Sequence, residues 1–498
     1  MTQTTAVHDD LPDFSSTLRT PLCELLGCRL PLILAGMGGV ARSELVAAVT
    51  LTGGFGFLGM AREPLALIEA QVRKVREQTK KRFGVNLIPA GTEPDLLQQQ
   101  VKLCIRLGVP VVGLFWDIRR EVIAQLREAG VTVVHQVGSM AQALEAREAG
   151  VDALIVQGVE AGGHVHGRQP LEKILADVLA VVDIPVAAAG GIATGEAVVQ
   201  LLSQGAQAAV LGTALLATQE SFAHEYHKQR VVDATVQDTV LTEDFHINWP
   251  AHAAVRVLRN SVTRGEHGDP HTQAHRQPIG EEEGRPIYLF STDSPLRSMT
   301  GDFEAMALYA GLGVGHIASI PSAAERIGEI MQHARLEWHR LHPPEVELSS
   351  PVCYAPEFER VRNAELMTRL NELLEAERAG VRVTAQTLAQ VPDPATRSLV
   401  EAVYRDEVQW CTMLLHAIRA MGGKSSTHTG DFFQKAMAIA DVNERLAFLN
   451  RGQGWVAKKL RELLPMVEDP VLNRNLARML DSHVENLDKV NDHLAHPG

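Results

Sequence analysis

The chain has 498 residues, of which 45% are hydrophobic and 21% charged, as is typical of a globular protein with two or three domains. Its formal net charge of −13 argues against nonspecific nucleic-acid binding, and five scattered cysteines without a CxxC pair indicate neither a disulfide framework nor a thiolate zinc site. The first twenty residues lack the apolar core of a signal peptide, and no uncharged apolar run reaches the length of a membrane span. We therefore expect a cytoplasmic protein without membrane contact.

Short apolar runs alternate with helical patterns between residues 20 and 335. The predicted strands cover residues 31–36, 54–59, 83–88, 109–116, 131–137, 152–157, 185–190 and 208–212. Eight buried strands at this spacing favour a (β/α)8 TIM barrel over an open sheet. We also predict intervening helices such as 42–52 and 195–204, and a polar surface excursion at 260–284.

The loops after the seventh and eighth strands have the composition of a phosphate site. They read Ala-Gly-Gly-Ile-Ala-Thr-Gly at 189–195 and Leu-Gly-Thr at 211–213. Each combines glycines, a hydroxyl and the start of a helix, so free N–H groups and the helix dipole can converge on a dianion. These are also the two loops that often hold phosphate in (β/α)8 enzymes.

The sixth predicted strand leads into Gln-Gly-Val-Glu-Ala-Gly-Gly-His at 157–164. Glycines let the backbone approach a ligand closely, and an imidazole just beyond them can accept a proton near neutral pH. In isolation the same residues would form a tight turn followed by a surface histidine. Glu160 either orients His164 or caps backbone N–H groups, and we expect His166 to face solvent.

Two further strand ends complete the candidate site. The first loop reads Ala-Gly-Met-Gly-Gly at 35–39, and the third strand ends in Gly-Val-Asn at 84–86. Small residues and the flexible Met37 thioether suit the face of a flat ring, and the Asn86 amide suits its polar edge. The alternative is that Met37 belongs to the barrel core and that Asn86 caps the next helix.

Together these motifs resemble the nitronate monooxygenase family, formerly called 2-nitropropane dioxygenases, over residues 20–335. The similarity rests on Leu-Ile-Leu-Ala-Gly-Met at 32–37, Gly-Gly-Phe-Gly-Phe-Leu at 53–58, Phe-Gly-Val-Asn at 83–86, the 157–164 string, Gly-Gly-Ile at 190–192 and Tyr-Ala-Gly-Leu-Gly-Val-Gly at 309–315.

The resemblance implies a barrel that binds FMN noncovalently and oxidises nitroalkanes or nitronates with O2. His164 aligns with the catalytic histidine and would remove a proton from the small-molecule substrate. The implied cofactor-binding residues are Ala35, Gly36, Met37, Asn86, Gln157, Gly163, Gly190, Gly191, Gly212 and Thr213, of which the last four would hold the phosphate. An alternative on the same barrel is NAD(P)H-dependent reduction of quinones or enoyl thioesters through FMN.

Three positions depart from the family pattern. Gly36 stands where a proline usually precedes the first-loop methionine, and Leu312 replaces a glutamine in the 309–315 string. The fourth strand ends in Phe115 and Trp116, which are bulky for a pocket wall. The identity of the substrate therefore does not follow from the resemblance.

The tail differs in composition from the barrel. Residues 336–358 contain the prolines and serines of a linker, and residues 359–495 contain four amphipathic segments at 359–390, 394–421, 430–463 and 469–495. Four helices of similar length predict a four-helix bundle, which we interpret as ferritin-like.

The tail also has carboxylates on each helix, but its di-metal pattern is incomplete. Trp410 stands where a histidine would follow Glu407 by three residues, and Leu480 stands where a glutamate would precede His483. The remaining candidate metal ligands are Glu377, Glu407, Glu444 and His483. A metal-binding redox module thus competes with a metal-free association module, and we expect the second, with exposed or paired carboxylates and a homodimer.

Overall fold

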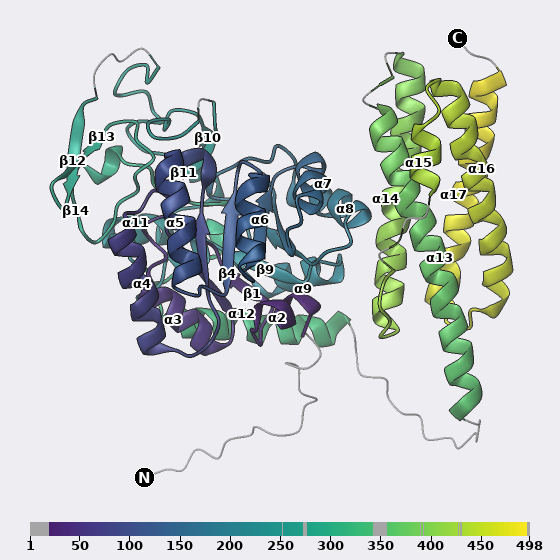
Figure 1. Ribbon diagram of the computed structural model, residues 1–498, viewed down its shortest axis with the longest axis horizontal. Helices are drawn as coiled ribbons and strands as arrows, with labels where there is room; N and C mark the ends of the chain where they lie inside the picture. The colour runs from purple at the N-terminus through teal and green to yellow at the C-terminus, as the bar shows by residue number, and fades with distance from the viewer. Residues whose placement is uncertain are drawn as a thin grey trace. The chain divides into compact units, whose positions relative to one another are not determined.

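The computed structural model describes residues 19–250, 252–271, 276–341, 356–388, 390–391, 393–426, 428 and 431–495. The chain divides into two compact units, a barrel unit and a helical unit (Figure 1). Within the described residues, no helix is both long and apolar enough to cross a membrane.

Eight parallel strands close the barrel in the order β1-β2-β3-β4-β5-β6-β8-β9, which confirms the predicted fold. They are β1 (Leu32–Leu34), β2 (Phe55–Gly59), β3 (Gly84–Leu87), β4 (Val111–Phe115), β5 (Thr132–Val137), β6 (Ala153–Gln157), β8 (Val186–Ala189) and β9 (Ala208–Leu211). All eight strands lie inside or at the bounds expected from the sequence, because buried parallel strands appear as continuous apolar runs.

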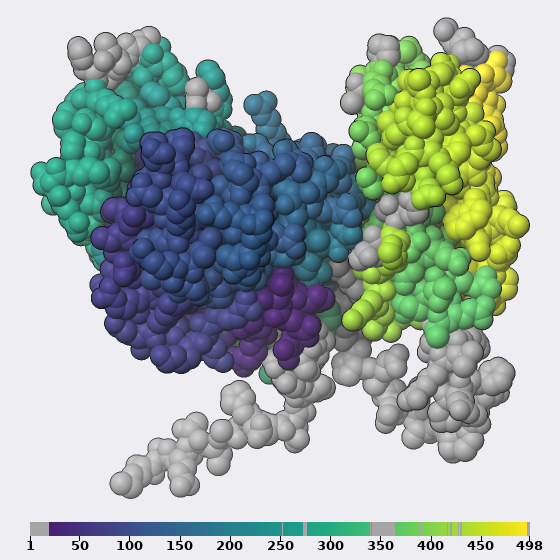
Figure 2. All heavy atoms as spheres, in the orientation of Figure 1, coloured from purple at the N-terminus to yellow at the C-terminus, as the bar shows by residue number. Residues whose placement is uncertain are grey.

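Helices surround these strands (Figure 1). They are α2 (Pro21–Leu26), α3 (Ser43–Thr52), α4 (Leu65–Gln78), α5 (Pro94–Arg106), α6 (Arg120–Glu128), α7 (Met140–Glu148), α8 (Leu171–Val181), α9 (Gly195–Ser203), α10 (Thr213–Leu216), α11 (Glu225–Val232) and α12 (Ala323–Leu341). In the space-filling view, the purple to blue segments form a continuous surface over this side of the barrel (Figure 2).

Large side chains fill the barrel interior, and small ones on neighbouring strands make room for them. Phe55 and Phe57 of β2 are buried and meet edge to face, with ring centroids 5.1 Å apart. Gly84 pairs with Phe57 across the strands, and a Cβ atom at Gly84 would lie 2.4 Å from the Phe57 ring. Such complementary packing fixes the ends of the strands, where the site is built.

Two small antiparallel sheets extend the barrel at the end where its strands terminate. One contains β7 (Gly163–His164), β10 (Thr239–Thr242) and β11 (Val255–Leu258), and the other contains β12 (Pro278–Glu282), β13 (Arg285–Tyr288) and β14 (Met299–Gly301). The prediction of a surface excursion at 260–284 is wrong only at its start, where Asn260 is fully buried and donates a hydrogen bond to the Met306 carbonyl. β12 is the central strand of its sheet, but its residues are exposed or half-buried, as that prediction expects.

The helical unit contains α13 (Pro356–Leu388), α14 (Pro394–Ala420), α15 (Phe432–Met437), α16 (Val442–Leu463) and α17 (Pro470–Ala495). The predicted single helix at 430–463 is wrong, because Asp441 accepts a hydrogen bond from the Glu444 N–H and starts α16 anew. Buried apolar residues from the long helices pack together, including Val383, Val400, Leu446 and Val490. α12 extends to Leu341 into the predicted linker 336–358, of which residues 342–355 lie outside the described chain.

The contact between α9 and α12 gives a test of the barrel packing. A Cβ atom at Gly195 would lie 2.2 Å from the Ala334 nitrogen. Gly195→Ala therefore forces the backbones of α9 and α12 apart and should destabilise the protein by about 1–3 kcal/mol. Gly328 on α12 has no atom within 4 Å of such a Cβ, so Gly328→Ala should be neutral or stabilising by about 0.5–1 kcal/mol. Urea unfolding of both variants measures the difference, and equal effects would contradict this packing.

Candidate functional site

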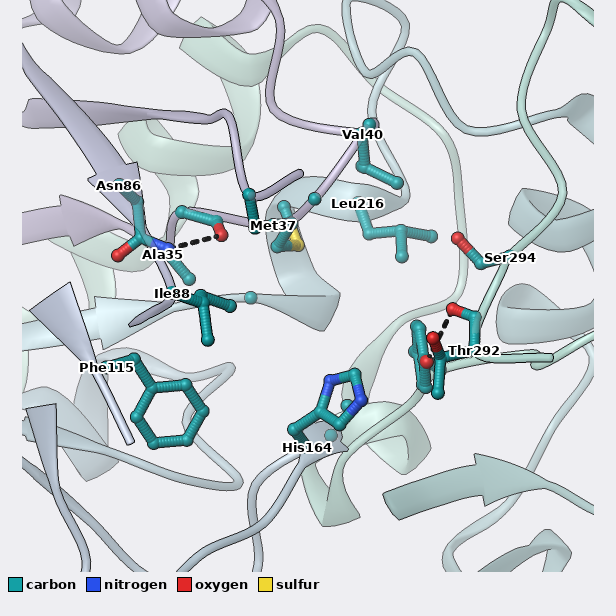
Figure 3. A pocket seen from close by; sticks show the side chains of 18 of the residues that line it. Ala35, Met37, Val40, Asn86, Ile88, Phe115, His164, Leu216, Thr292 and Ser294 are labelled. Carbon is teal, nitrogen blue, oxygen red and sulfur yellow. Dashed lines mark hydrogen bonds between the residues drawn. The ribbon is translucent and has the colours of Figure 1, made fainter. Parts of the chain in front are cut away.

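A cavity of about 380 Å³ lies at the carboxyl ends of the barrel strands, which is within the range of roughly 300–1,000 Å³ for small-molecule sites. All residues that the sequence placed in the site line it: Ala35, Gly36, Met37, Asn86, Gln157, Gly163, His164, Gly190, Gly191, Gly212 and Thr213. Met37 and Asn86 lie across the open space from the His164 ring (Figure 3). The eight strand ends therefore form one concave site.

Gly36 and Asn86 fit each other at one wall of the cavity. The Asn86 Nδ2 atom donates a hydrogen bond to the Gly36 carbonyl at 3.3 Å (Figure 3). A Cβ atom at Gly36 would lie only 2.2 Å from the Asn86 Cβ, so a side chain at this position would displace Asn86. Gly36 stands where the family usually has a proline, and its lack of a side chain leaves the space that Asn86 occupies. The next α-helix, α5, is capped by Glu93 and not by Asn86.

The loops after β8 and β9 form a neighbouring part of the site, since a Cβ atom at Gly212 would lie 4.0 Å from the Met37 sulfur. Gly190 and Gly191 have φ of +134° and +67°, conformations that glycine adopts without strain. Thr213 opens α10 directly after Gly212, and its hydroxyl oxygen accepts a hydrogen bond from the Gly311 N–H at 3.0 Å. This bond ties the 309–315 segment to the eighth strand end.

His164 lies on β7, where pairing with Val255 of β11 fixes its backbone. Its ring stacks on the Trp249 indole, with centroids 3.4 Å apart and planes inclined by 28°. The Gln157 side chain secures both sides of this segment, since it donates to the His164 carbonyl at 2.8 Å and accepts from the His166 N–H at 3.0 Å. The imidazole is thereby held at one orientation.

The electrostatics of His164 favour the neutral ring. Its Nε2 atom is buried and has no hydrogen-bond partner among the described residues. Burial disfavours the charged form and, with a smaller contribution from the Arg62 charge, lowers the pKa of His164 to about 3. The imidazole is therefore uncharged at neutral pH, and one of its two ring nitrogens carries no proton.

The structure decides between the two roles expected for Glu160 and corrects the expectation for His166. Both carboxylate oxygens of Glu160 accept from the Leu171 N–H, at 3.0 and 3.1 Å, so Glu160 caps backbone and makes no such bond to His164. His166 does not face solvent: it is half-buried, its ring lies 4.2 Å from the Trp116 ring, and Gln142 contacts its Nε2 atom at 3.1 Å. Trp116 reaches this position with φ of +81°, which moves its bulk away from the cavity wall that Phe115 forms.

Sequence reasoning missed the charged rim of the cavity. Arg62 and Arg285 both lie beside Asp293, at 4.0 and 3.4 Å, and Arg285 also pairs with Glu282 at 2.8 Å. These residues come from the β2–α4 connection and from β12, β13 and the segment after it. The charged composition of the insertion after the eighth strand was the available signal, but its folding back over the site depends on long-range strand pairing.

The candidate metal ligands of the helical unit are brought together only in part. Glu377, Glu407 and His483 are buried, and the Glu377 Oε1 atom lies 3.2 Å from the His483 Nε2 atom. Glu444 is exposed at the start of α16, and Gln453 occupies the fourth place, between Glu407 and His483. Across the described part of the chain, no group of three or more His, Cys, Asp or Glu side chains is arranged to hold a metal ion.

We expected these carboxylates to be exposed or paired. Glu377 and Glu407 are not exposed but buried. Burial raises the pKa of Glu377 to about 8 and also raises the pKa of Glu407, which additionally faces Glu377. The helical unit therefore contains two carboxyl groups that its interior disfavours in ionised form.

The barrel with its glycine-lined cavity and neutral histidine defines an oxidoreductase of the nitronate monooxygenase type. The family profile "Nitronate monooxygenase" matches residues 19–333, and the chain belongs to this family. A second profile, a domain of unknown function (DUF6306), matches residues 364–492.

Several curated proteins are similar to this chain over nearly half of its length. A (3aS,4S,5R,7aS)-5-hydroxy-7a-methyl-1-oxo-octahydro-1H-indene-4-carboxyl-CoA dehydrogenase from Rhodococcus jostii is 37% identical over 46% of this chain and 63% of its own length. Its namesake from Mycobacterium tuberculosis is 38% identical over 49% of this chain and 67% of its own. A probable nitronate monooxygenase from Staphylococcus haemolyticus is 30% identical over 45% of this chain and 75% of its own.

Two solved structures share the fold of this unit. FabK from Thermotoga maritima superposes with a TM-score of 0.57 and 29% identity, covering 65% of this chain and 98% of that one. A nitroalkane oxidase from Streptomyces ansochromogenes gives a TM-score of 0.53 and 31% identity, covering 64% of this chain and 99% of that one.

The low pKa of His164 predicts an acid-dependent loss of stability. The pKa of His164 is about 6.5 in the unfolded chain and about 3 in the folded protein. Between these two pH values a proton binds the unfolded chain and not the folded one. The stability that is present above pH 6.5 is therefore lost as the pH falls. His164→Gln should remove up to about 1.4 kcal/mol per pH unit of this dependence. Unfolding measured at pH 6.5, 5.5 and 4.5 tests it. The exposed His252→Gln is the control, and an unchanged slope in His164→Gln would refute the burial of this base.

Proposed function

We propose that the barrel oxidises nitroalkanes or nitronates with O2, using FMN as cofactor and His164 as general base. The observation that carries this proposal is the His164 imidazole, which is neutral and has a buried, unpartnered Nε2 atom on the cavity wall. The carbon next to a nitro group is acidic because the nitro group takes up the charge, so a neutral imidazole suffices to deprotonate it.

The glycines of the cavity wall support the proposal of FMN. Cβ atoms added at Gly38 and Gly163 would meet nothing within 4 Å, so both glycines leave open space along the wall. Ala35, Gly36, Met37, Asn86, Gln157 and Gly163 would lie along the ring system, and Gly190, Gly191, Gly212 and Thr213 would hold the phosphate. Bound FMN would accept the substrate's electrons and pass them to O2.

The chain's own residues account for the proton transfer. His164 would take the α-proton at Nε2, while Gln157 fixes the backbone on both sides of the ring. The Trp249 indole covers one face of the imidazole and keeps water from it. The same desolvation that keeps the ring neutral leaves its lone pair free for the substrate.

Cofactor binding is tested by two glycines with matched backbones. Gly163 and Gly130 have φ of +75° and +76°, and neither has an atom within 4 Å of an added Cβ. Leucine at either position therefore costs a similar amount, about 1–2 kcal/mol. Only Gly163→Leu places its side chain in the cavity, so it should lose FMN, whereas Gly130→Leu, on the exposed surface, should retain it. Flavin content after gel filtration is the measurement, and full retention in Gly163→Leu would speak against this site.

The base role of His164 predicts a substrate-dependent defect. His164→Asn should slow turnover of a neutral nitroalkane by about 10²–10⁴-fold, the usual contribution of a general base. Turnover of the pre-formed nitronate should fall much less, because that anion needs no deprotonation. Oxygen consumption with both substrates measures the ratio, and an equal loss on both would exclude His164 as the base.

A second candidate function is NAD(P)H-dependent reduction of an enoyl thioester or quinone through FMN. It is supported by the two relatives described as dehydrogenases of a CoA compound, which at 37–38% identity exceed the 30% of the nitronate monooxygenase relative. Anaerobic mixing separates the two functions. Rapid bleaching of bound flavin by nitronate supports the monooxygenase, and rapid bleaching by NADPH supports the reductase.

For the helical unit, the proposal is a metal-free bundle that associates two chains in a cytoplasmic homodimer. The replacement of a fourth acidic ligand by Gln453, whose amide contacts both Glu407 and His483, supports the absence of metal.

A further inference from the structure

The helical unit contains a cavity of its own, of about 430 Å³, between α13, α15 and α16. Its walls are mainly apolar and include Ala376, Ala379, Phe432, Phe448, Leu449 and Val456. Two glycines create the space: a Cβ atom at Gly380 would lie 2.3 Å from the Glu407 carboxyl group, and one at Gly452 would lie 2.8 Å from the Phe432 ring. Four-helix bundles commonly place ligand sites between facing helices in this way.

Glu407 is a deeply buried carboxyl group on the cavity wall, with 3% of its surface exposed. Behind it, a chain of polar contacts passes through Gln453 and His483 to Glu377, so each of the four long helices contributes one polar side chain. Glu377 contacts His483 at 3.2 Å and also interacts with the Glu407 carboxyl group. Two carboxyl groups thus meet away from water, which is costly for their ionised forms unless a cation lies beside them.

The rest of the lining favours a positively charged guest. Glu372, Glu375 and Glu407 contribute three carboxyl groups to the lining and Arg451 contributes one guanidinium. Glu372 is paired with Lys459 at 3.2 Å and Glu375 accepts a hydrogen bond from Ser426, so Glu407 is the carboxyl group that a guest would meet. The guanidinium of Arg451 lies over the Phe448 ring, 5.2 Å from its centroid, so this aromatic wall already accepts a cation. Phe432 and Phe448 stack with ring centroids 4.8 Å apart and form a flat apolar surface.

We propose that this cavity binds a small organic cation, namely a protonated primary amine with an aromatic body. Its ammonium group supplies three donors to the carboxyl end at Glu407, and its apolar body packs against Phe432 and Phe448. An anion of the same shape is repelled by the three glutamates, and a neutral analogue brings no charge to the buried carboxyl group. The proposal stands on the helical unit alone and does not depend on the function of the barrel.

The test is calorimetric titration of the full-length protein with three probes that share a 2-phenylethyl group: 2-phenylethylamine, 2-phenylethanol and 3-phenylpropionate. We expect one amine bound per chain, at least about tenfold weaker binding of the alcohol, and no binding of the carboxylate. Glu407→Gln should weaken amine binding at least about tenfold, whereas Glu444→Gln, which changes an exposed glutamate on the same unit, should leave it unchanged.

A second variant keeps the test decisive if Glu407→Gln disturbs folding. Ala376→Phe fills the cavity from its half-buried wall without touching the polar chain, and should abolish amine binding while the helical circular dichroism is retained. Equal affinities for amine and alcohol, or amine binding that survives both substitutions, would overturn the proposal. So would stoichiometric binding of Zn²⁺ or Mn²⁺ that is lost in Glu407→Gln without any response to the amine.

Discussion

Desolvation of the His164 imidazole is the constraint on which the barrel's chemistry depends. The ring lies flat against Trp249, and its Nε2 atom has no hydrogen-bond partner in the described chain. An exposed histidine would be partly protonated near neutral pH and unable to serve as a base in that form. Here the surrounding protein keeps the ring neutral, at the cost of leaving a polar atom unsatisfied until a substrate arrives. That unsatisfied atom is why we regard the cavity as a reaction site and not as a packing defect.

The geometry around His164 follows from how the strands end. Parallel closure brings eight carboxyl ends to one rim, and complementary pairs such as Gly36 with Asn86 determine how closely the walls approach. β7 then leaves the barrel to pair with β11, which carries His164 under the Trp249 loop. The charged rim built on Asp293 completes the entrance, with Arg62 and Arg285 facing one carboxylate.

The sequence predicted the parts of this arrangement that local pattern determines. Continuous apolar runs identified all eight strands, and the glycines and His164 followed because they stand directly at strand ends. Trp249 could not be found in this way, because its place on the His164 ring depends on antiparallel pairing between segments about 90 residues apart. Asp293 follows the β12–β13 hairpin, and no local pattern indicates that this hairpin brings it to the cavity. The role of Glu160 was open for a similar reason: whether it caps Leu171 or orients His164 depends on how the loop folds back. In the tail, Glu444 follows the Asp441 cap and lies on the exposed face of α16, which it shares with Arg451 and Trp455.

The central claim is that the strand ends form one FMN site facing His164, and a crystal structure of the protein with FMN tests it most directly. The account predicts the phosphate against the loops after β8 and β9, at Gly190, Gly191, Gly212 and Thr213. It also predicts the ring system between the Met37–Asn86 wall and His164, within reach of the Nε2 atom. FMN bound elsewhere, or a cavity that stays closed by Trp249 and takes up no flavin at saturating concentration, would contradict it.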